Sequence, residues 1–395
     1  MKVQKIGVRP VFDSRGKETI EVVFRAKRIF SAKIPSGASR GTGEASVFTP
    51  AAAKKSAEKV QEKLRGKEFC SLREFDLALL ALDSSSRKEK IGGNVALGLS
   101  IAAARALAFE KNQEPWELLS EEFFPKVKAP LPLLFSNVIN GGAHARSNLD
   151  LQEYMFVADP SGDLLGAVRQ LISLYRELGA LLKKERRVTL LPRGDEGGYA
   201  LDFSNNLEPL ELLQRIVEEK GLEHTFSLAL DAAASQFFRN GRYSFDGASR
   251  TSQELHEFYL YAAENVPLLF SVEDPFAEQD REAFRAFLKK AGKSMWVVGD
   301  DLTATHAEEI RNARGLVNGV IIKPNQVGTV TETCKALEEA RKQGMKVIVS
   351  HRSGETSDQF IVHLARACGA DGVKLGAPAG ERMGKYNELL RVYTV

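Results

Sequence analysis

Six short apolar runs in the second half of the chain each end in a residue that can do chemistry. The runs 226–230, 268–272, 295–299, 319–322, 346–350 and 371–373 lead to Asp231, Glu273, Asp300, Lys323, His351 and Lys374, in that order. Short β-rich runs of this kind are typical of buried parallel strands. Amphipathic helix patterns separate most of them, for example at 280–290, 329–343 and 357–367. Repeated strand–helix units predict an α/β barrel, in which these side chains would meet at one mouth.

The first 125 residues follow a different pattern. Alternating positions predict strands at 6–11 and 19–25, a segment rich in Gly, Ser and Ala follows at 30–44, and helical patterns occupy 51–64 and 94–111. Pro130 and Pro132 mark a junction, after which the pattern at 133–140 predicts the first strand of the larger part. We therefore expect a smaller α+β domain at 1–125 and a barrel domain at 126–395.

Composition narrows the classes of function. The 55 Lys and Arg residues nearly balance the 52 Asp and Glu residues, and no basic run is long enough to indicate nucleic-acid binding. No apolar stretch is long enough to span a bilayer. The three cysteines lack metal-ligand spacing, which favours a reducing compartment. We expect a cytoplasmic protein with neither a nucleic-acid partner nor membrane insertion.

Three acids at successive strand ends form the first candidate site. Asp231, Glu273 and Asp300 supply hard oxygen ligands with no Cys or His beside them, a set that suits Mg²⁺. The alternative is that each acid caps a helix or pairs with a lysine. Their shared position at strand ends favours the metal site.

Two lysines, Lys323 and Lys374, follow at equivalent strand ends. A lysine close to another cation and to metals would have a lowered pKa and could act as a general base. The alternative is an ion pair with the neighbouring acids, and both interpretations can hold in the same empty site.

Loops supply the remaining candidates. Arg352 and Ser353 follow His351 at a loop start, where Gly354 allows close backbone approach, so a phosphate or carboxylate could bind there. Glycine-rich loops carry His144 and Glu196, and Gln152 with Glu153 follows another apolar stretch. A glutamate on such a loop could protonate a leaving group, although glycine-bounded loops are also ordinary turns.

The motifs resemble those of the enolases, which dehydrate 2-phosphoglycerate to phosphoenolpyruvate. The matching strings are FDSRG at 12–16, PSGAS at 35–39, NVINGG at 137–142, GDEGG at 194–198, VEDPF at 272–276, GDDLT at 299–303, NQVGT at 325–329, SHRSGET at 350–356 and KLGAP at 374–378. They span nearly the whole chain in the order typical of the family. The resemblance implies a small α+β domain on a modified (β/α)₈ barrel that begins ββαα.

The resemblance also implies roles for single residues. It assigns Asp231, Glu273 and Asp300 to a tighter Mg²⁺, and Ser39 to a second Mg²⁺ that arrives with substrate. It makes Lys323 the base that removes the C2 proton and Glu196 the acid that helps the C3 hydroxyl leave, with Glu153 beside it. It places Lys374 on the substrate carboxylate, Arg352 and Ser353 on the phosphate, and His144, Gln152 and His351 around the substrate.

Enolases form dimers, so the resemblance implies a homodimer or a larger assembly of dimers, with Glu21 and Arg391 as an ion pair between subunits. The chain departs from the family at Arg40, Arg146 and Pro324, which affects loops and not catalytic groups. Two alternatives stay open. The chain could catalyse another metal-dependent reaction on the same barrel, such as sugar-acid dehydration, or could serve as a non-enzymatic binding protein.

Overall fold

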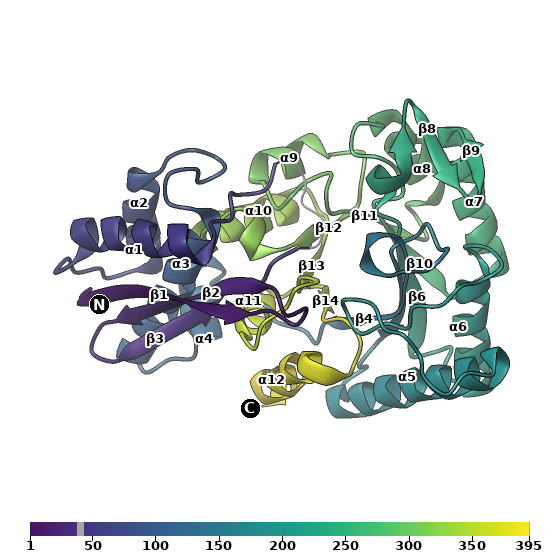
Figure 1. The fold of residues 1–395 in the computed structure, drawn as a ribbon, viewed down its shortest axis with the longest axis horizontal. Coiled ribbons are helices and arrows are strands. Elements are labelled where there is room, and N and C mark those ends of the chain that lie inside the picture. The colour runs from purple at the N-terminus through teal and green to yellow at the C-terminus, as the bar shows by residue number, and fades with distance from the viewer. Residues whose placement is uncertain (38–42, 395) are drawn as a thin grey trace.

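The computed structural model describes residues 1–37 and 43–394. The N-terminal part forms an antiparallel sheet of β1 (Lys5–Phe12), β2 (Glu18–Arg25) and β3 (Ile29–Lys33), followed by four helices. These are α1 (Pro50–Leu64), α2 (Leu72–Leu82), α3 (Gly93–Glu110) and α4 (Pro115–Phe123). Figure 1 shows these purple and blue elements grouped beside the barrel.

The larger part is a closed eight-stranded barrel. Its strands are β4 (Leu133–Asn140), β5 (Glu153–Ala158), β6 (Phe226–Asp231), β10 (Leu269–Glu273), β11 (Trp296–Gly299), β12 (Gly319–Ile322), β13 (Lys346–Ser350) and β14 (Gly372–Lys374). β5 is antiparallel to both β4 and β6, whereas the other neighbouring pairs are parallel. The elements run β4, β5, α5, α6, β6, which confirms the ββαα start.

Helices surround the barrel. They are α5 (Leu164–Arg186), α6 (Glu208–Glu219), α7 (Ser252–Asn265), α8 (Arg281–Ala291), α9 (Ala307–Asn312), α10 (Val330–Lys342), α11 (Phe360–Cys368) and α12 (Met383–Thr394). A small sheet of β7 (Phe238–Arg239), β8 (Arg242–Phe245) and β9 (Ala248–Arg250) projects between β6 and α7. No helix within 1–37 and 43–394 is long and apolar enough to cross a membrane.

Local chemistry explains where several helices begin. Thr329 caps α10, its hydroxyl accepting a hydrogen bond from the N–H of Glu332, and Thr251 forms a reciprocal capping box with Glu254 at the start of α7.

Inside the barrel a separate apolar layer fills the space between strands. It comprises Phe135, Met155, Val157, Ala229, Val298, Ile321 and Ile348. The barrel is thus a packed core, and only the ends of its strands are available for a site.

The two parts of the chain are joined by direct contacts around residues 353–358. The N–H and C=O groups of Ser36 pair with those of Gly354, and the N–H of Ser14 donates to the Glu355 carbonyl at 2.8 Å. Arg105 from α3 makes two hydrogen bonds, of 2.8 and 2.9 Å, to Asp358. The N-terminal part therefore lies over the barrel's active face.

The predicted fold class is confirmed, and the six strands whose ends we predicted to carry chemistry all form. One expected helix differs: α11 begins at Phe360, later than the expected 357, because Asp358 is used to bind Arg105 and the N–H groups of Lys33 and Phe360. The sequence pattern gave no range for several elements that the structure contains, namely β3, β5, α2, α4, α5, α6, α7, α9, α12 and the β7–β9 sheet.

Candidate active site

The residues that follow the barrel strands line one cavity. Its lining is Gly37, His144, Gln152, Glu153, Glu196, Asp231, Ala233, Asp274, Asp300, Asp301, Lys323, Ser350, His351, Arg352, Ser353 and Lys374. Of the candidates from the sequence, Glu273 is not in this lining but contacts Lys374, which is. Ser39 and Arg40 lie outside the described residues. The structure thus brings the other candidates together.

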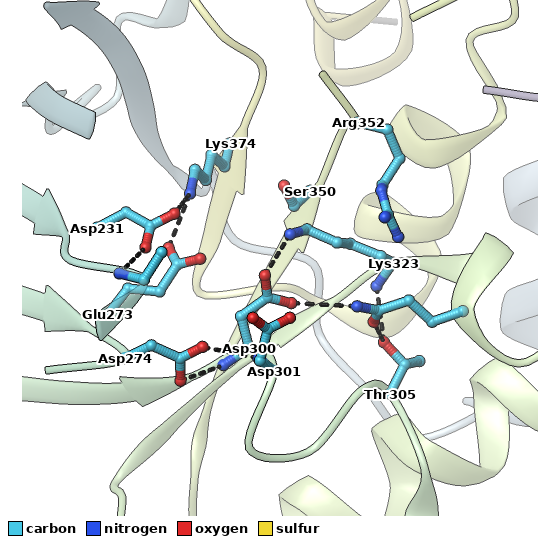
Figure 2. A network of polar contacts seen from close by, with 12 residues as sticks. Asp231, Glu273, Asp274, Asp300, Asp301, Thr305, Lys323, Ser350, Arg352 and Lys374 are labelled. Carbon is cyan, nitrogen blue, oxygen red and sulfur yellow. Dashed lines mark hydrogen bonds and ion pairs between the residues drawn. The ribbon is translucent and has the colours of Figure 1, made fainter. Parts of the chain in front are cut away.

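Lys374, at the end of β14, holds three carboxylates. Its Nζ lies 2.8 Å from Glu273 Oε2, 2.9 Å from Glu153 Oε2 and 3.2 Å from Asp231 Oδ2. Figure 2 shows its contacts with Asp231 and Glu273. Burial would lower the pKa of Lys374, but Asp231 and the other carboxylates outweigh it and raise that pKa well above its usual range. Lys374 is a fixed positive charge.

Lys323 forms an ion pair with Asp300, as Figure 2 shows. Burial alone would lower the pKa of Lys323, but the Asp300 carboxylate outweighs both burial and the nearby cations, and the pKa is raised. The expected lowering of the Lys323 pKa was tied to metal ions beside it, so it stays a prediction for the site with metal bound. The ion-pair alternative describes the structure, because Asp300 contacts Lys323 more closely than any other charge does.

Asp274 is a buried group that the sequence analysis missed. It follows Glu273 with a left-handed backbone (φ 41°), and its carboxylate accepts the N–H groups of Asp300 and Asp301 at 3.0 and 2.7 Å. Burial raises the pKa of Asp274 well above its usual range and that of Asp301 to about 7. The adjacent acids in VEDPF and GDDLT were the available signal, but sequence cannot tell which acid of each pair faces the cavity.

Two glutamates face the opposite wall with two histidines. His144 Nδ1 lies 3.6 Å from both Glu153 Oε1 and Glu196 Oε1, and His351 Nε2 lies 3.4 Å from Glu196 Oε2. Burial lowers the pKa of His351 to about 4, so this ring is neutral at neutral pH. Burial and the charge of Glu196 raise the pKa of Glu153 well above its usual range. Burial would also raise the pKa of Glu196, but its contacts with His351 and His144 and the charge of Lys374 outweigh burial and hold that pKa well below its usual range. In this arrangement Glu153 therefore carries a proton and Glu196 is ionised.

The loop after β13 supplies donors for an anion. Arg352 is buried and makes hydrogen bonds to Glu44 and Asn325. Ser353 Oγ accepts from Arg15 Nη1 at 3.4 Å. On the other side of the cavity, Gln152 Nε2 donates to Asp231 Oδ2 at 3.2 Å. The predicted anion-binding residues therefore lie in the same cavity as the acids and lysines.

Family comparisons agree with this geometry. Residues 128–394 match the family model described as the enolase C-terminal TIM barrel domain, and residues 3–119 match the enolase N-terminal domain. The chain belongs to the enolase family. It is 38% identical to an enolase of Methanosarcina barkeri over an alignment of 410 positions, which covers 99% of this chain and 94% of that protein. An enolase of Aeropyrum pernix is 37% identical, with 100% and 94% covered. The chain is accordingly a hydro-lyase, as the resemblance implied.

Enolases use a divalent metal, and the cavity has the character that such a cation needs. Its described lining contains six carboxylates, those of Glu153, Glu196, Asp231, Asp274, Asp300 and Asp301, against the three cations Lys323, Arg352 and Lys374. Glu273 Oε1 is buried without a hydrogen-bond partner among the described residues. This excess of buried carboxylate oxygens, which can serve as metal ligands, fits a hard cation.

The grouping of the acids differs in detail from the predicted triad. Within the described residues, ligand atoms that lie within 4.8 Å of one another come from Asp274, Asp300 and Asp301 in one group. A second group contains His144, Glu153 and Glu196. Asp231 and Glu273 instead share the ammonium group of Lys374. The triad stays a prediction, which metal titration can test.

Proposed function

We propose that this enzyme catalyses the reversible, Mg²⁺-dependent dehydration of 2-phosphoglycerate to phosphoenolpyruvate, with Lys323 as the base and Glu196 as the acid. The observation that carries the assignment is that a lysine following β12 and two glutamates from other elements, Glu153 and Glu196, line one buried cavity. A substrate between them would present its C2 proton to one and its C3 hydroxyl to the other. General acid and base groups typically contribute about 10²- to 10⁴-fold each.

The chain's own residues would divide the chemistry as follows. To act as the base, Lys323 must first lose the proton that its ion pair with Asp300 keeps on Nζ. The charges of Arg352 and Lys374 act against that protonated form, and a cation bound by Asp300 would weaken the ion pair. The neutral Nζ would then accept the C2 proton. Glu153, whose pKa is raised, would carry the proton in the free site and pass it to the nearby Glu196, which would donate it to the departing hydroxyl. Neutral His144 and His351 contact this pair without adding charge, so the proton stays on the carboxyl groups.

Substrate binding would use the fixed charges. Lys374 would hold the substrate carboxylate, and Arg352 with Ser353 would hold the phosphate. Gln152, His144 and His351 would complete the walls. All of these side chains are buried, so binding would remove the substrate from water and strengthen each charged contact.

We further propose two Mg²⁺ ions for each active site. Asp231, Glu273 and Asp300 would bind the first, and Ser39 would bind a second that arrives with substrate. When bound, Mg²⁺ supplies positive charge that stabilises the carboxylate dianion formed on loss of the C2 proton. A lysine or histidine base working beside Mg²⁺ is the known chemistry of the enolase superfamily, so this pairing follows from family membership and not from the geometry alone.

Proton exchange tests the assignment of base and acid. In D₂O with Mg²⁺, NMR of 2-phosphoglycerate reports exchange at C2, while absorbance reports formation of phosphoenolpyruvate. Lys323→Ala should lose both. Glu196→Gln should lose turnover but keep some exchange, because the base survives. Exchange at the wild-type rate in Lys323→Ala would mean that another group is the base. Activity of the wild-type protein on unphosphorylated acids would support another metal-dependent reaction, such as sugar-acid dehydration. No turnover by the wild-type protein would support a non-enzymatic binding protein.

We also propose a homodimer in the cytoplasm, with the chain dividing into domains at about residue 125. Within one protomer, Arg391 already makes ion pairs with Glu114 and Glu388, and Glu21 with Arg9. The proposed pair between Glu21 and Arg391 of two subunits would thus have to exchange partners. Sedimentation of the wild-type protein would test whether it forms dimers.

A further inference from the structure

Glu44 connects the N-terminal part of the chain to the mouth of the barrel. Its neighbours along the backbone are both held on the barrel. His306 Nε2 lies 2.9 Å from the carbonyl oxygen of Gly43, and the N–H of Ala45 donates to the carbonyl of Gln326 at 2.8 Å. The Glu44 residue is 6% exposed. Its carboxylate is therefore held beneath the surface at a defined place.

That carboxylate binds the guanidinium group of Arg352. Nη2 of Arg352 donates to both oxygens of Glu44, at 3.1 and 3.2 Å, and Nη1 donates to Oε2 at 3.3 Å. Nη1 also donates to Asn325 Oδ1 at 3.2 Å. A buried carboxylate that contacts both terminal nitrogens fixes the plane of the guanidinium group.

Gln326 extends this contact toward the acids of the site. Its Nε2 donates to Glu44 Oε1 and to Asp300 Oδ1, each at 3.3 Å. Pro324 begins the 3₁₀ turn that carries Asn325 and Gln326, so one short turn supplies both polar neighbours of the Glu44–Arg352 pair. The pair is thus part of a continuous buried network around Asp300.

We propose that Glu44 is a positioning residue, which orients Arg352 so that its guanidinium group can bind the phosphate of the substrate. The inference rests on the proposed role of Arg352 and adds a residue from the other part of the chain. Glu44 itself does not touch the substrate. It acts through the arginine, and it makes phosphate binding depend on the docking of the segment at 43–45.

Two effects of removing the Glu44 charge oppose each other. A negative charge near the phosphate disappears, which favours phosphate binding. The guanidinium group of Arg352 also loses the carboxylate that holds it in place. Burial would lower the pKa of Arg352, but the charge of Glu44 and then that of Asp300 raise it, so Asp300 is the next carboxylate that attracts this group. Without Glu44, the guanidinium group would turn toward Asp300. We expect this loss of orientation to outweigh the relief of repulsion.

The experiment compares Glu44→Gln and Glu44→Asp with wild type at saturating Mg²⁺. It measures KM for 2-phosphoglycerate, kcat, and the inhibition constant of inorganic phosphate as a competitive inhibitor. Glu44→Gln should raise KM and the inhibition constant by a similar factor, about tenfold to a hundredfold, as for loss of a hydrogen bond between charged groups. The value of kcat should change less. Glu44→Asp, which keeps the charge, should recover part of the affinity.

Asp358→Asn is the matched control. Asp358 makes the same kind of two-bond contact between the two parts of the chain, but its partner Arg105 does not line the cavity. This variant should lower the midpoint of thermal unfolding and leave both constants unchanged. A Glu44→Gln protein with unchanged or tighter phosphate inhibition would overturn the positioning role.

Arg352→Lys separates failure of this inference from failure of the proposed function. If Arg352→Lys leaves phosphate inhibition unchanged, Arg352 does not bind the phosphate, and the role that the proposed function gives to Arg352 fails. If Arg352→Lys weakens inhibition but Glu44→Gln and Glu44→Asp do not, only the positioning role fails. In the double variant Glu44→Gln/Arg352→Lys, the two losses should be less than additive, because both act on one contact.

Discussion

Asp76 is predicted to make the stability of the protein fall as the pH rises. The residue lies on α2, is fully buried, and accepts hydrogen bonds at 2.9 Å from Ser100 Oγ and from the N–H of Thr331 in the first turn of α10. Burial raises its pKa from 3.8 to about 7. The folded state therefore holds this proton more tightly than the unfolded state does, and stability is lost between about pH 4 and pH 7.

The magnitude follows from that shift. At about 1.4 kcal/mol for each tenfold change in proton affinity, a rise from 3.8 to about 7 corresponds to about 4 kcal/mol. Asp76→Asn removes the proton and keeps an oxygen that can accept from Ser100 and Thr331. Its amide group can also donate to Thr331 Oγ1, which is buried without a partner among the described residues. The variant should be as stable as wild type near pH 4 and, on the same arithmetic, more stable by up to about 4 kcal/mol near pH 8.

Urea unfolding at several pH values measures this difference. Trp116 on α4 and Trp296 on β11 report on the two parts of the chain by fluorescence. Asp83→Asn is the control. Burial would raise the pKa of this aspartate, but hydrogen bonds from Ser85, Lys90 and Ile91 outweigh burial and hold that pKa below the usual range. The control should be destabilising at pH 8, the opposite sign. An Asp76→Asn protein that is less stable than wild type at pH 8, or a difference that does not change with pH, would refute the reasoning.

Three further predictions concern the metal, the packing of the N-terminal part and the assembly. Asp231→Asn and Glu273→Gln should each lower Mg²⁺ affinity at least about tenfold, because each removes a hard anionic ligand. Calorimetry measures the affinity, and an unchanged circular dichroism spectrum shows that the fold persists. Unchanged affinity in both variants would rule out the triad. Gly98→Ala should lower the urea midpoint of unfolding, because the added Cβ would lie 2.2 Å from Val22 Cγ2. Overpacking costs about 1–3 kcal/mol, which exceeds the gain in helix propensity of about 1 kcal/mol. Adding Val22→Ala should restore part of the lost stability. Arg391→Ala should weaken the dimer in sedimentation experiments, by a few kcal/mol if the proposed Glu21–Arg391 pair between subunits is partly desolvated. A monomeric wild-type protein would contradict this prediction.

Strand ends were the part of the site that sequence could predict. A parallel strand is short, apolar and followed at once by the mouth of the barrel, so the residue after each run was placed without knowing any contact. Asp231, Lys323 and Lys374 all lie where that rule puts them. The order of the motifs then identified the family, which the fold alone could not do.

Pairing between charged groups could not be predicted from sequence. The position of Lys323 follows from its strand, but its pKa depends on a distance to Asp300 that no periodicity encodes. Glu44 was missed for a related reason. It lies in a segment rich in Gly, Ser and Ala without helical or strand periodicity, and its partner Arg352 is 308 residues away. The β7–β9 sheet was missed because its strands have only two to four residues.

The contacts around residues 353–358 explain why the two parts of the chain act as one enzyme. A barrel mouth is open to water unless something covers it, and charged contacts weaken in water. Here the N-terminal part supplies that cover. Ser36 pairs with Gly354 through the backbone, Ser14 donates to Glu355, and Glu44 binds Arg352. The loop that would bind the phosphate is therefore also the surface on which the N-terminal part docks. Loss of the Glu44 contact would move Arg352, the proposed phosphate ligand, before it moved the lysines, because Lys323 and Lys374 are held at the ends of barrel strands.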